Sequence, residues 1–328
     1  MMLQLVWGLS CLPKFALIRR CLVIQLKKFL SLSINILGCF YQIRIAMKKK
    51  VSVLCISYNH EKYLKNALDG ILNQVTEFDY ELIIYDDCSL DKSRDVIQSI
   101  VDAYKGKCEI KLVFPSENQY SKGFTVIPFM LPYVEGEYIA ICEGDDYWID
   151  NNKLQKQYES LKHDHSVDIC FHPSFTLLDG NIQDKGYGYL EEEGKKIDYS
   201  QVVMKGGSMM PMASIFFRAQ PLLDIVSKNE EFFKRNFYHS ILQAVMVLGK
   251  GALYIPDKMS VYRSMHDGSW TLQQSLDKEK REREFKASNK RLWELNQIFN
   301  NKYLGLFLKF YYKRNVKFYK DKLKSIYK

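Results

Sequence analysis

The chain has 328 residues, enough for one large domain or two small ones. Its 47% hydrophobic and 26% charged residues are ordinary for a folded protein and argue against disorder. The eight cysteines form no CxxC pair and no Cys/His cluster, which excludes a zinc ribbon or an iron–sulfur signature and is typical of a reduced, intracellular chain.

The net charge of +9 comes from the two ends of the chain. Residues 1–50 hold nine Lys/Arg and no acid, and residues 301–328 have a net charge of +8, which leaves −8 for residues 51–300. A domain that binds nucleic acid carries positive charge on its folded surface. We therefore expect no nucleic-acid partner.

The first 46 residues are apolar and basic, unlike the rest of the chain. Their longest charge-free run, residues 29–43, has 15 residues, fewer than the roughly 20 that span a bilayer. We expect residues 1–46 to be an N-terminal extension, disordered or artefactual, with Met47 as the true start. A membrane-surface anchor is the alternative.

From residue 51 onward, apolar runs and helical periodicity alternate. The pattern predicts strands at 51–57, 81–85, 109–114 and 137–142 and helices at 61–73 and 92–104, with segment 122–134 helical in part. Continuous apolar strands indicate a sheet that is covered on both faces. The succession predicts an α/β fold with a mostly parallel central sheet flanked by helices.

The alternation loosens after residue 150. The predicted elements are a helix, an apolar run, a strand, an apolar helix, a short strand and a charged helix, at 153–162, 167–171, 213–217, 240–248, 252–255 and 271–300. A polar, glycine-bearing stretch, 179–200, separates the second from the third. The chain ends in a predicted amphipathic helical region.

Polar clusters follow three of the four predicted strands, where an open parallel sheet binds its ligands. They are Ser57-Tyr58-Asn59-His60, Asp86-Asp87 and Glu143-Gly144-Asp145-Asp146. The three acids of the last cluster repel one another unless a cation or solvent relieves them, and hard oxygen ligands favour Mg²⁺ or Mn²⁺. The structural alternatives are a solvated acidic turn and, for Asp86-Asp87, an Asx turn with a helix cap.

Glycine loops that cradle phosphates are missing. No GxGxxG follows the first predicted strand, and no GxxxxGK[ST] occurs. We therefore expect a nucleotide to be held by carboxylates and a metal, not by a loop of backbone amides.

Four stretches occur in the order expected for a known family: VSVLCISYNHEKYLKNALDGILNQ, ELIIYDDCSLDKS, SENQYSKG leading into GEYIAICEGDDYWIDNNKLQKQ, and GKGALYIPDKMSVYRSMHDGSW. They resemble the family 2 glycosyltransferases, inverting enzymes of the GT-A fold that use nucleotide-diphosphate sugars. The resemblance implies a catalytic domain at 47–270, a Mn²⁺ or Mg²⁺ cofactor, and a role in making a surface polysaccharide such as capsule or lipopolysaccharide. The region that follows, 271–328, is predicted from its residue pattern to be helical, basic and amphipathic.

The resemblance also implies how the nucleotide is held. Tyr58 would pack against the base, and Asp87 would hydrogen-bond it, with Asp86 beside it; uracil is the favoured base. Asp145 would bind the ribose and the metal. The bland alternative for Tyr58 is an aromatic residue at the rim of the site.

For the metal and the closing loop, the resemblance points to residues on both sides of the site. Asp146 would be the direct metal ligand, and His266 would complete the metal–diphosphate site. Arg263 and Trp270 would shape the loop that closes over it. His266 as a surface histidine without a metal is the alternative.

One position departs from the family. The family presents an aspartate, the general base, shortly before an apolar helix that ends in Gly. Here that helix is SILQAVMVLGK (240–250), and alignment on it places His239 at the aspartate position. His239 is therefore the predicted base, although nearby acids and a diphosphate favour its charged form. The alternatives are that Glu230 or Glu231 serves instead, that the transferase is slow or inactive, or that His239 only starts the helix.

The C-terminal region, 301–328, has the pattern of a basic amphipathic helix. Six lysines from Lys309 to Lys328 fall on one side of the helical wheel, and Leu and Tyr residues fall mostly on the other. We expect it to dock a cytoplasmic enzyme on the inner face of the membrane, where lipid-linked acceptors are presented. The alternative is a solvated helix packed on the catalytic domain.

Two other functions remain open on the sequence. A sugar nucleotidyltransferase shares the α/β plan, but a Gly-rich basic loop would then replace SYNHEKY after the first strand. A catalytically impaired nucleotide-sugar-binding protein would account for the missing aspartate.

Overall fold

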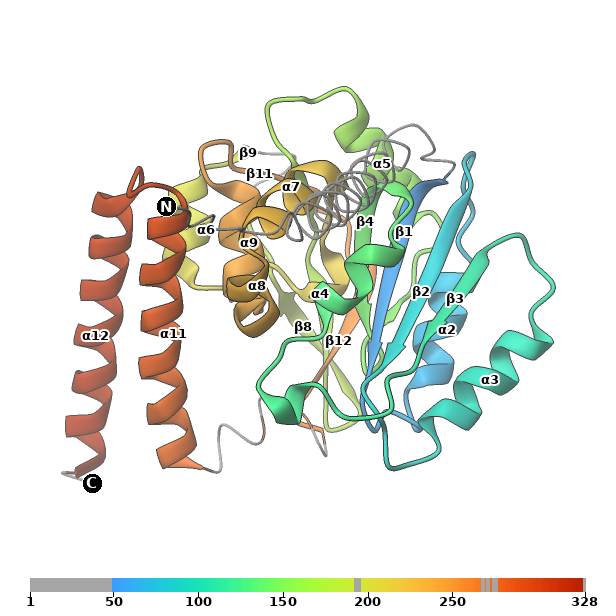
Figure 1. The fold of residues 1–328 in the computed structure, drawn as a ribbon, viewed down its shortest axis with the longest axis horizontal. Helices are drawn as coiled ribbons and strands as arrows, with labels where there is room; N and C mark the ends of the chain where they lie inside the picture. Colours follow the sequence, from blue (N-terminus) through green and yellow to red (C-terminus); the bar gives the residue numbers. More distant parts are fainter. Residues whose placement is uncertain (1–48, 192–195, 267–268, 270–271, 273–276, 327–328) are drawn as a thin grey trace, which may run out of the picture. The chain divides into compact units, whose positions relative to one another are not determined.

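An eight-stranded sheet forms the centre of the computed structural model (Figure 1), which describes residues 49–191, 196–266, 269, 272 and 277–326. These residues belong to one compact unit, Lys48–Lys328. The predicted extension, residues 1–46, lies outside the described residues.

Four parallel strands make up one half of this sheet, as predicted. Their order is β3 (Glu109–Val113), β2 (Tyr80–Asp86), β1 (Lys49–Ser57) and β4 (Gly136–Glu143). β2 is buried along its whole length, because helices cover both faces of the sheet. The parallel arrangement brings the carboxyl ends of β1, β2 and β4 to one edge.

The crossover helices α2 (Leu64–Leu72) and α3 (Ser93–Ala103) pack against one face of the sheet through apolar residues at helical spacing. The sequence places the first helix from residue 61, but the helix begins at Leu64. The backbone N–H groups of Tyr63 and Leu64 both donate to the carbonyl of His60, so residues 61–63 form a turn that carries the chain out of the site.

The second half of the sheet is mixed. β10 (Phe216–Arg218) pairs antiparallel with β4, and β6 (Ile169–Phe171), β11 (Ala252–Tyr254) and β9 (Lys196–Ile197) follow in that order. The strand expected at 213–217 is shifted, because residues Met212–Ser214 form a 3₁₀ turn. The carbonyls of Ala213 and Ser214 accept hydrogen bonds from the side chains of Trp148 and Gln157 instead of from a strand.

A second, four-stranded sheet was not foreseen. It contains β5 (Tyr147–Trp148), β12 (Ser260–Ser264), β7 (Ser174–Leu178) and β8 (Asn181–Tyr187). β7 and β8 form a hairpin whose turn, Asp179-Gly180, has positive φ at both residues, the conformation that an Asp-Gly pair favours. The polar stretch 179–200 therefore contributes β8, β9 and the start of α6 (Tyr199–Lys205).

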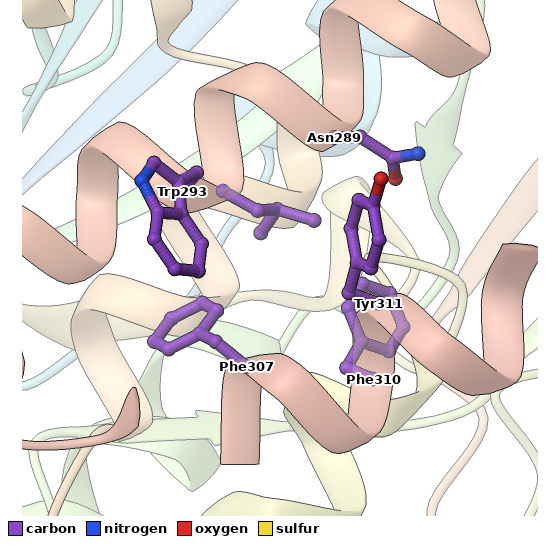
Figure 2. Close-up of a pocket in the computed structure, with 6 residues that line it drawn as sticks. Asn289, Trp293, Phe307, Phe310 and Tyr311 are labelled. Atoms are coloured by element: carbon purple, nitrogen blue, oxygen red, sulfur yellow. The ribbon is translucent and has the colours of Figure 1, made fainter. Parts of the chain in front are cut away.

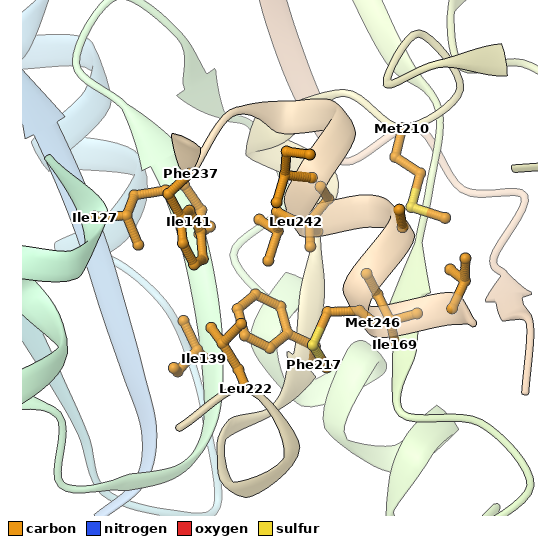
Figure 3. Packing of buried hydrophobic residues seen from close by; sticks show 14 of the residues in the cluster. Ile127, Ile139, Ile141, Ile169, Met210, Phe217, Leu222, Phe237, Leu242 and Met246 are labelled. Atoms are coloured by element: carbon orange, nitrogen blue, oxygen red, sulfur yellow. The ribbon is translucent and has the colours of Figure 1, made fainter. Parts of the chain in front are cut away.

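The larger core lies on the other face of the central sheet (Figure 3). Side chains from β4, β6 and β10 meet those of α7 (Ala219–Lys228) and α9 (His239–Val247), among them Ile139, Ile169, Phe217, Leu222, Leu242 and Met246. α9 is apolar because most of its residues are buried in this core. Its first residue, His239, is thereby held by a well-packed helix.

Several shorter helices complete the body: α4 (Ile127–Met130), α5 (Lys153–Lys162) and α8 (Glu230–Asn236). The chain ends in two long helices that lie side by side (Figure 1), α11 (Lys278–Ile298) and α12 (Leu304–Ile326). The rings of Phe285 and Phe318 stack between them at a centroid distance of 3.9 Å. Among the described residues, no helix combines the length and the hydropathy of a membrane-spanning segment.

Candidate active site

The loops that follow β1 and β2 are tied together by hydrogen bonds. The backbone N–H of Asn59 donates to Ser89 Oγ at 2.8 Å, and the N–H of Leu90 donates to Asn59 Oδ1 at 2.8 Å. The N–H of His60 donates to Ser93 Oγ at 2.9 Å. The edge of the sheet where we expect the ligand is therefore a fixed surface.

Asp86 is fully buried and organises the loop after β2. Its Oδ1 accepts from the N–H of Ser89 at 3.0 Å and from Arg94 Nε at 2.7 Å, and its Oδ2 accepts from Ser89 Oγ. This is the Asx-turn arrangement that the sequence left open as a structural alternative. The contacts assign Asp86 a loop-shaping role beside the predicted nucleotide site.

Asp87 fastens the segment that carries SENQYSKG. Its Oδ1 accepts from the N–H of Gln119 at 2.8 Å, and its Oδ2 accepts from the N–H of Tyr120 at 3.0 Å. Asn118 Nδ2 donates to the backbone carbonyl of Asp87 at 2.8 Å. Tyr58, in the loop after β1, keeps 41% of its surface exposed, which leaves its ring open for stacking.

Asp145 lies between two histidines. Its Oδ2 is 2.9 Å from Nε2 of His266 and 3.8 Å from Nε2 of His60. Burial alone would raise the pKa of Asp145, but the hydrogen bond from His266 and the charge of His60 lower it overall. The structure therefore brings together Asp145 and His266, two of the residues that the sequence suggests for a metal site.

Asp146 is buried, and one of its oxygens has no protein partner. Oδ1 accepts from the backbone N–H of Arg263 at 2.9 Å, whereas Oδ2 is buried with no hydrogen-bond partner among the described residues. Burial and the neighbouring carboxylates of Asp145 and Glu143 raise the pKa of Asp146 well above its usual value. A positive charge beside Oδ2 would give this buried oxygen a partner and would offset the repulsion between the carboxylates.

Arg263, in β12, lies between two aromatic rings. Its guanidinium carbon is 5.0 Å from the ring centroid of Tyr63 and 4.8 Å from that of Tyr147. Tyr63 also meets His266 edge-on at a centroid distance of 4.9 Å. These contacts connect β12 to β5 and to the turn before α2. Trp270 lies outside the described residues, so its predicted role stays a prediction.

His239 faces the first acid of the EGDD cluster. Its Nε2 is 3.3 Å from Oε1 of Glu143. The partial burial of the ring would lower the pKa of His239, but Glu143 and Asp145 raise it overall. Glu230 and Glu231, the alternative bases, lie in α8, where both contact Lys234 and keep most of their side chains exposed.

The chemistry of these residues fits a divalent cation. Within the part of the chain that the structure describes, no three His, Cys, Asp or Glu side chains already stand as a set of metal ligands. The partnerless oxygen of Asp146 and the acids around it nevertheless form a place where a hard cation would be favourable.

Three residues of the site were given no role by the sequence. His60 was visible after the first predicted strand, but its contact with Asp145 depends on the pairing of β1 with β4. Tyr63 and Tyr147 are ordinary aromatic residues in sequence, and only the fold brings both to Arg263.

Comparison with known proteins decides the family. The model of glycosyl transferase family 2 matches residues 52–221, more than half of the chain. The chain belongs to glycosyl transferase family 2. The matched region of this family 2 chain includes the Asp86-Asp87 and EGDD clusters, whereas His239 and His266 follow it.

The alignments with related proteins include only part of this chain and only part of each relative. An uncharacterized protein of Mycobacterium tuberculosis is 32% identical over 221 residues, which are 67% of this chain and 60% of that protein. An uncharacterized glycosyltransferase of Haemophilus influenzae is 36% identical over 149 residues, 45% of this chain and 55% of that protein. The chain thus spans about 60% of the length of this mycobacterial relative.

A solved structure supports the fold. Residues 1–349 of Staphylococcus aureus TarS, in complex with UDP-GlcNAc, superpose with a TM-score of 0.55 at 17% identity, covering 80% of this chain and 73% of that one. The predicted α/β fold of the GT-A type, with helices at its C-terminal end, is confirmed.

Proposed function

We propose that the chain transfers a sugar from a nucleotide-diphosphate sugar, with inversion at the anomeric carbon, to a glycan or lipid-linked acceptor in the synthesis of a surface polysaccharide. The observation that carries the proposal is the family 2 match over a strand edge at which Asp145, Asp146 and His266 converge. A uridine nucleotide is the favoured donor, since TarS is named a poly(ribitol-phosphate) β-N-acetylglucosaminyltransferase and was solved with UDP-GlcNAc.

The nucleotide lies, in this proposal, along the loops after β1 and β2. The exposed ring of Tyr58 stacks on the base, and Asp87 hydrogen-bonds the base while it also holds the backbone of 118–120 beside it. Asp86 accepts hydrogen bonds from Ser89 and Arg94 and so stabilises the loop after β2 without touching the nucleotide. Asp145 is left to contact the ribose.

Asp145, Asp146 and His266 would hold the metal, Mn²⁺ or Mg²⁺. When bound, such an ion offsets the negative charge that develops on the leaving diphosphate. Arg263, anchored between Tyr63 and Tyr147, keeps β12 in place and with it the histidine that follows. Trp270 belongs to the same proposed closing loop.

His239 acts as the general base. It takes the proton of the acceptor hydroxyl while the acceptor oxygen forms its bond to the anomeric carbon. The bond from that carbon to the diphosphate breaks at the same time, and its electron pair leaves with the nucleotide. Because attack and departure occur on opposite faces, the configuration inverts.

Product analysis tests this reaction. The chain is incubated with UDP-sugars, Mn²⁺ and glycan or lipid-linked acceptors, and released UDP and the anomeric configuration of the product are measured by NMR. We expect UDP release that depends on the acceptor, with a product of inverted configuration. Retention of configuration, or UDP release that is the same with and without acceptor, would contradict the proposal.

A nucleotide-sugar-binding protein without turnover is the second candidate. The observation in its favour is the histidine at the base position, which Glu143 and Asp145 keep in a more basic, more readily charged state. Tight binding of UDP-sugars with no turnover of any acceptor would favour it.

The acceptor is proposed to lie at a membrane surface, because α12 exposes an apolar and basic face. The helix packs on the body through Phe307 and Phe310, which are buried. Six other large side chains are more than a third exposed: Leu304, Leu308, Tyr311, Tyr312, Tyr319 and Leu323. The lysines predicted on the polar side are exposed too, among them Lys309, Lys313 and Lys317.

α11 extends this face. Trp293 is 44% exposed and lines a shallow pocket with Phe307, Phe310 and Tyr311 (Figure 2). Aromatic side chains next to lysines suit the interface of an anionic bilayer. We therefore propose peripheral attachment to the inner face of the cell membrane through α12.

A further inference from the structure

Each of the three acids at the carboxyl end of β4 has a different partner. Asp145 contacts His266 and His60, and Asp146 accepts from the backbone of Arg263. Glu143 instead contacts His239, 96 positions further along the chain. The side chain of Glu143 is 29% exposed and that of His239 is 49% exposed, so the pair borders solvent, where an acceptor can enter.

The backbone on both sides of this contact is firmly held. Glu143 is the last residue of β4, and the N–H of Gly144 donates to the carbonyl of Ile56 at 2.7 Å. A Cβ at Gly144 would lie 2.9 Å from His60 Nδ1 and 3.1 Å from that carbonyl, so the chain passes here in close contact with the β1 loop. His239 starts a helix that is buried in the larger core.

The contact engages one ring nitrogen of His239 and leaves the other available. Nε2 lies at hydrogen-bond distance from Glu143, and Nδ1 has no hydrogen-bond partner among the described residues. An imidazole that donates its Nε2–H to a carboxylate presents Nδ1 as a lone-pair acceptor. Glu143 is thus placed to favour the tautomer of His239 that has its proton on Nε2 and a free lone pair on Nδ1. A general base requires such a lone pair.

We propose that Glu143 is a positioning residue that holds His239 with Nε2 protonated and Nδ1 directed to the acceptor hydroxyl. This inference rests on the proposed function and deepens it. The hydroxyl proton passes to Nδ1, the acceptor oxygen bonds to the anomeric carbon, and the diphosphate departs with the electron pair of the broken bond. Glu143 keeps its hydrogen bond to Nε2–H throughout and stabilises the imidazolium that forms. An aspartate at position 239 would need no partner of this kind, because a carboxylate has no ring tautomers to select.

A double-mutant cycle tests whether Glu143 acts through His239. We expect Glu143→Ala to lower kcat by at least about tenfold, with the KM for the donor changed by less than about twofold. The double variant E143A/H239A should be no slower than H239A alone. Equal losses in both backgrounds would show that Glu143 acts elsewhere, at the nucleotide or the metal, and would overturn the inference.

The aspartate of the family supplies a second background. In His239→Asp, the new carboxylate lies beside Glu143 and the two charges repel each other. We therefore expect Glu143→Gln to lower kcat when His239 is present but to leave it unchanged or raise it in the H239D variant. Glu137→Gln, on the same strand but paired with Lys50 at the surface, is the matched control and should be silent in both backgrounds. A loss on E143Q in the H239D variant as well would contradict the proposal.

A readout without turnover separates this inference from the proposed reaction. The ¹⁵N shifts of the His239 ring in the full chain should report the Nε2–H tautomer above the pKa of the ring, and a mixture of tautomers in E143Q. Nδ1–H in the unaltered chain would overturn the inference whether or not sugar is transferred. An Nε2–H ring in a chain that turns over no acceptor would support the positioning contact and count against the transferase alone.

Discussion

The surroundings of His239, the proposed general base, predict a particular dependence of kcat on pH. Burial acts to lower the pKa of His239, but Glu143 and Asp145 outweigh it and raise the pKa above the ordinary 6.5. A base works in its neutral form, so kcat should rise with pH through a value above 6.5. Without the Glu143 charge the pKa falls, so in Glu143→Gln this limb should move to lower pH while the plateau drops.

The pH profile of kcat for the two forms checks this prediction. Saturating donor and acceptor are used at each pH, and Glu137→Gln again serves as the control. A limb that stays at the same pH in E143Q would show that His239 does not control the rate.

Asp146 is expected to lower the stability of the metal-free protein while being needed for activity. Its pKa is raised by burial and by two neighbouring acids, so this carboxyl group lowers the free energy of unfolding at neutral pH. The cost decreases as pH falls below the raised pKa and is gone below the ordinary pKa of an aspartate. Asp146→Asn should therefore stabilise the metal-free protein by about 1 kcal/mol and reduce transfer severely. Thermal unfolding in chelator, with and without Mn²⁺, measures this. An unfolding temperature below that of the unaltered chain would contradict it.

Sequence reasoning found the acids of the site but not all of their partners. Asp145, Asp146 and His266 were chosen from local motifs, and the fold brings them together. The contacts of His60 with Asp145 and of Glu143 with His239 join segments that are far apart in sequence, so no local pattern announces them. Asp86 and Arg94 are only eight residues apart, but their ion pair depends on the turn between β2 and α3, which no residue pattern specifies.

Among the elements, α2 shows how tightly the site-bearing segments are packed. A Cβ at Gly70, in the middle of α2, would lie 2.5 Å from the backbone oxygen of Trp148 in β5. Alanine favours helices over glycine by roughly 1 kcal/mol. At position 70, however, the steric clash with Trp148 should outweigh the gain in helix propensity. Gly70→Ala should therefore lower the free energy of unfolding by about 1–3 kcal/mol.

Gly305→Ala in α12 is the matched control, because nothing lies within 4 Å of its would-be Cβ. It should be neutral or stabilising. Urea unfolding of both variants gives the two free energies of unfolding. A Gly70→Ala variant as stable as Gly305→Ala would show that α2 and β5 are not in such close contact.

Elements with a strong period were predictable, and short or polar ones were not. The four parallel strands are predictable because each is rich in apolar residues and two helices of clear 3.6-residue period alternate with them. β1, β2 and β4 are largely buried, and β3, at the edge of the sheet, is partly buried. β8 was not predicted, because its residues are mostly polar and it lies in the smaller sheet. The Asp179-Gly180 pair did indicate the turn that precedes it. α7 and α8 were missed as well, in a region where no strand alternates with them.

For the molecule as a whole, the face of α12 predicts binding to anionic membranes. The wheel pattern is visible in the sequence, and the structure shows that Phe307 and Phe310 are buried in the core, whereas large side chains elsewhere on α12 stay exposed: Leu304, Leu308, Tyr311, Tyr312, Tyr319 and Leu323. We expect sedimentation of the full chain with phosphatidylglycerol vesicles, weakened by salt, and little with phosphatidylcholine alone.

Charge reversal tests whether α12 makes this contact. Lys313→Glu with Lys317→Glu should abolish vesicle binding. The control, Lys105→Glu with Lys107→Glu at the exposed end of α3, makes the same change in net charge and should bind normally. Equal loss in both variants would mean that net charge, and not α12, governs the binding.

The central claim is that the acids after β4 bind the diphosphate of a nucleotide sugar together with a divalent cation. Calorimetric titration of the chain with UDP-sugars, in Mn²⁺ and in chelator, tests it most directly, with Asp146→Asn compared with Glu137→Gln. We predict binding that requires Mn²⁺, is lost in D146N and is kept in E137Q. Equal affinity in chelator, or a D146N variant that binds as the unaltered chain does, would contradict the account.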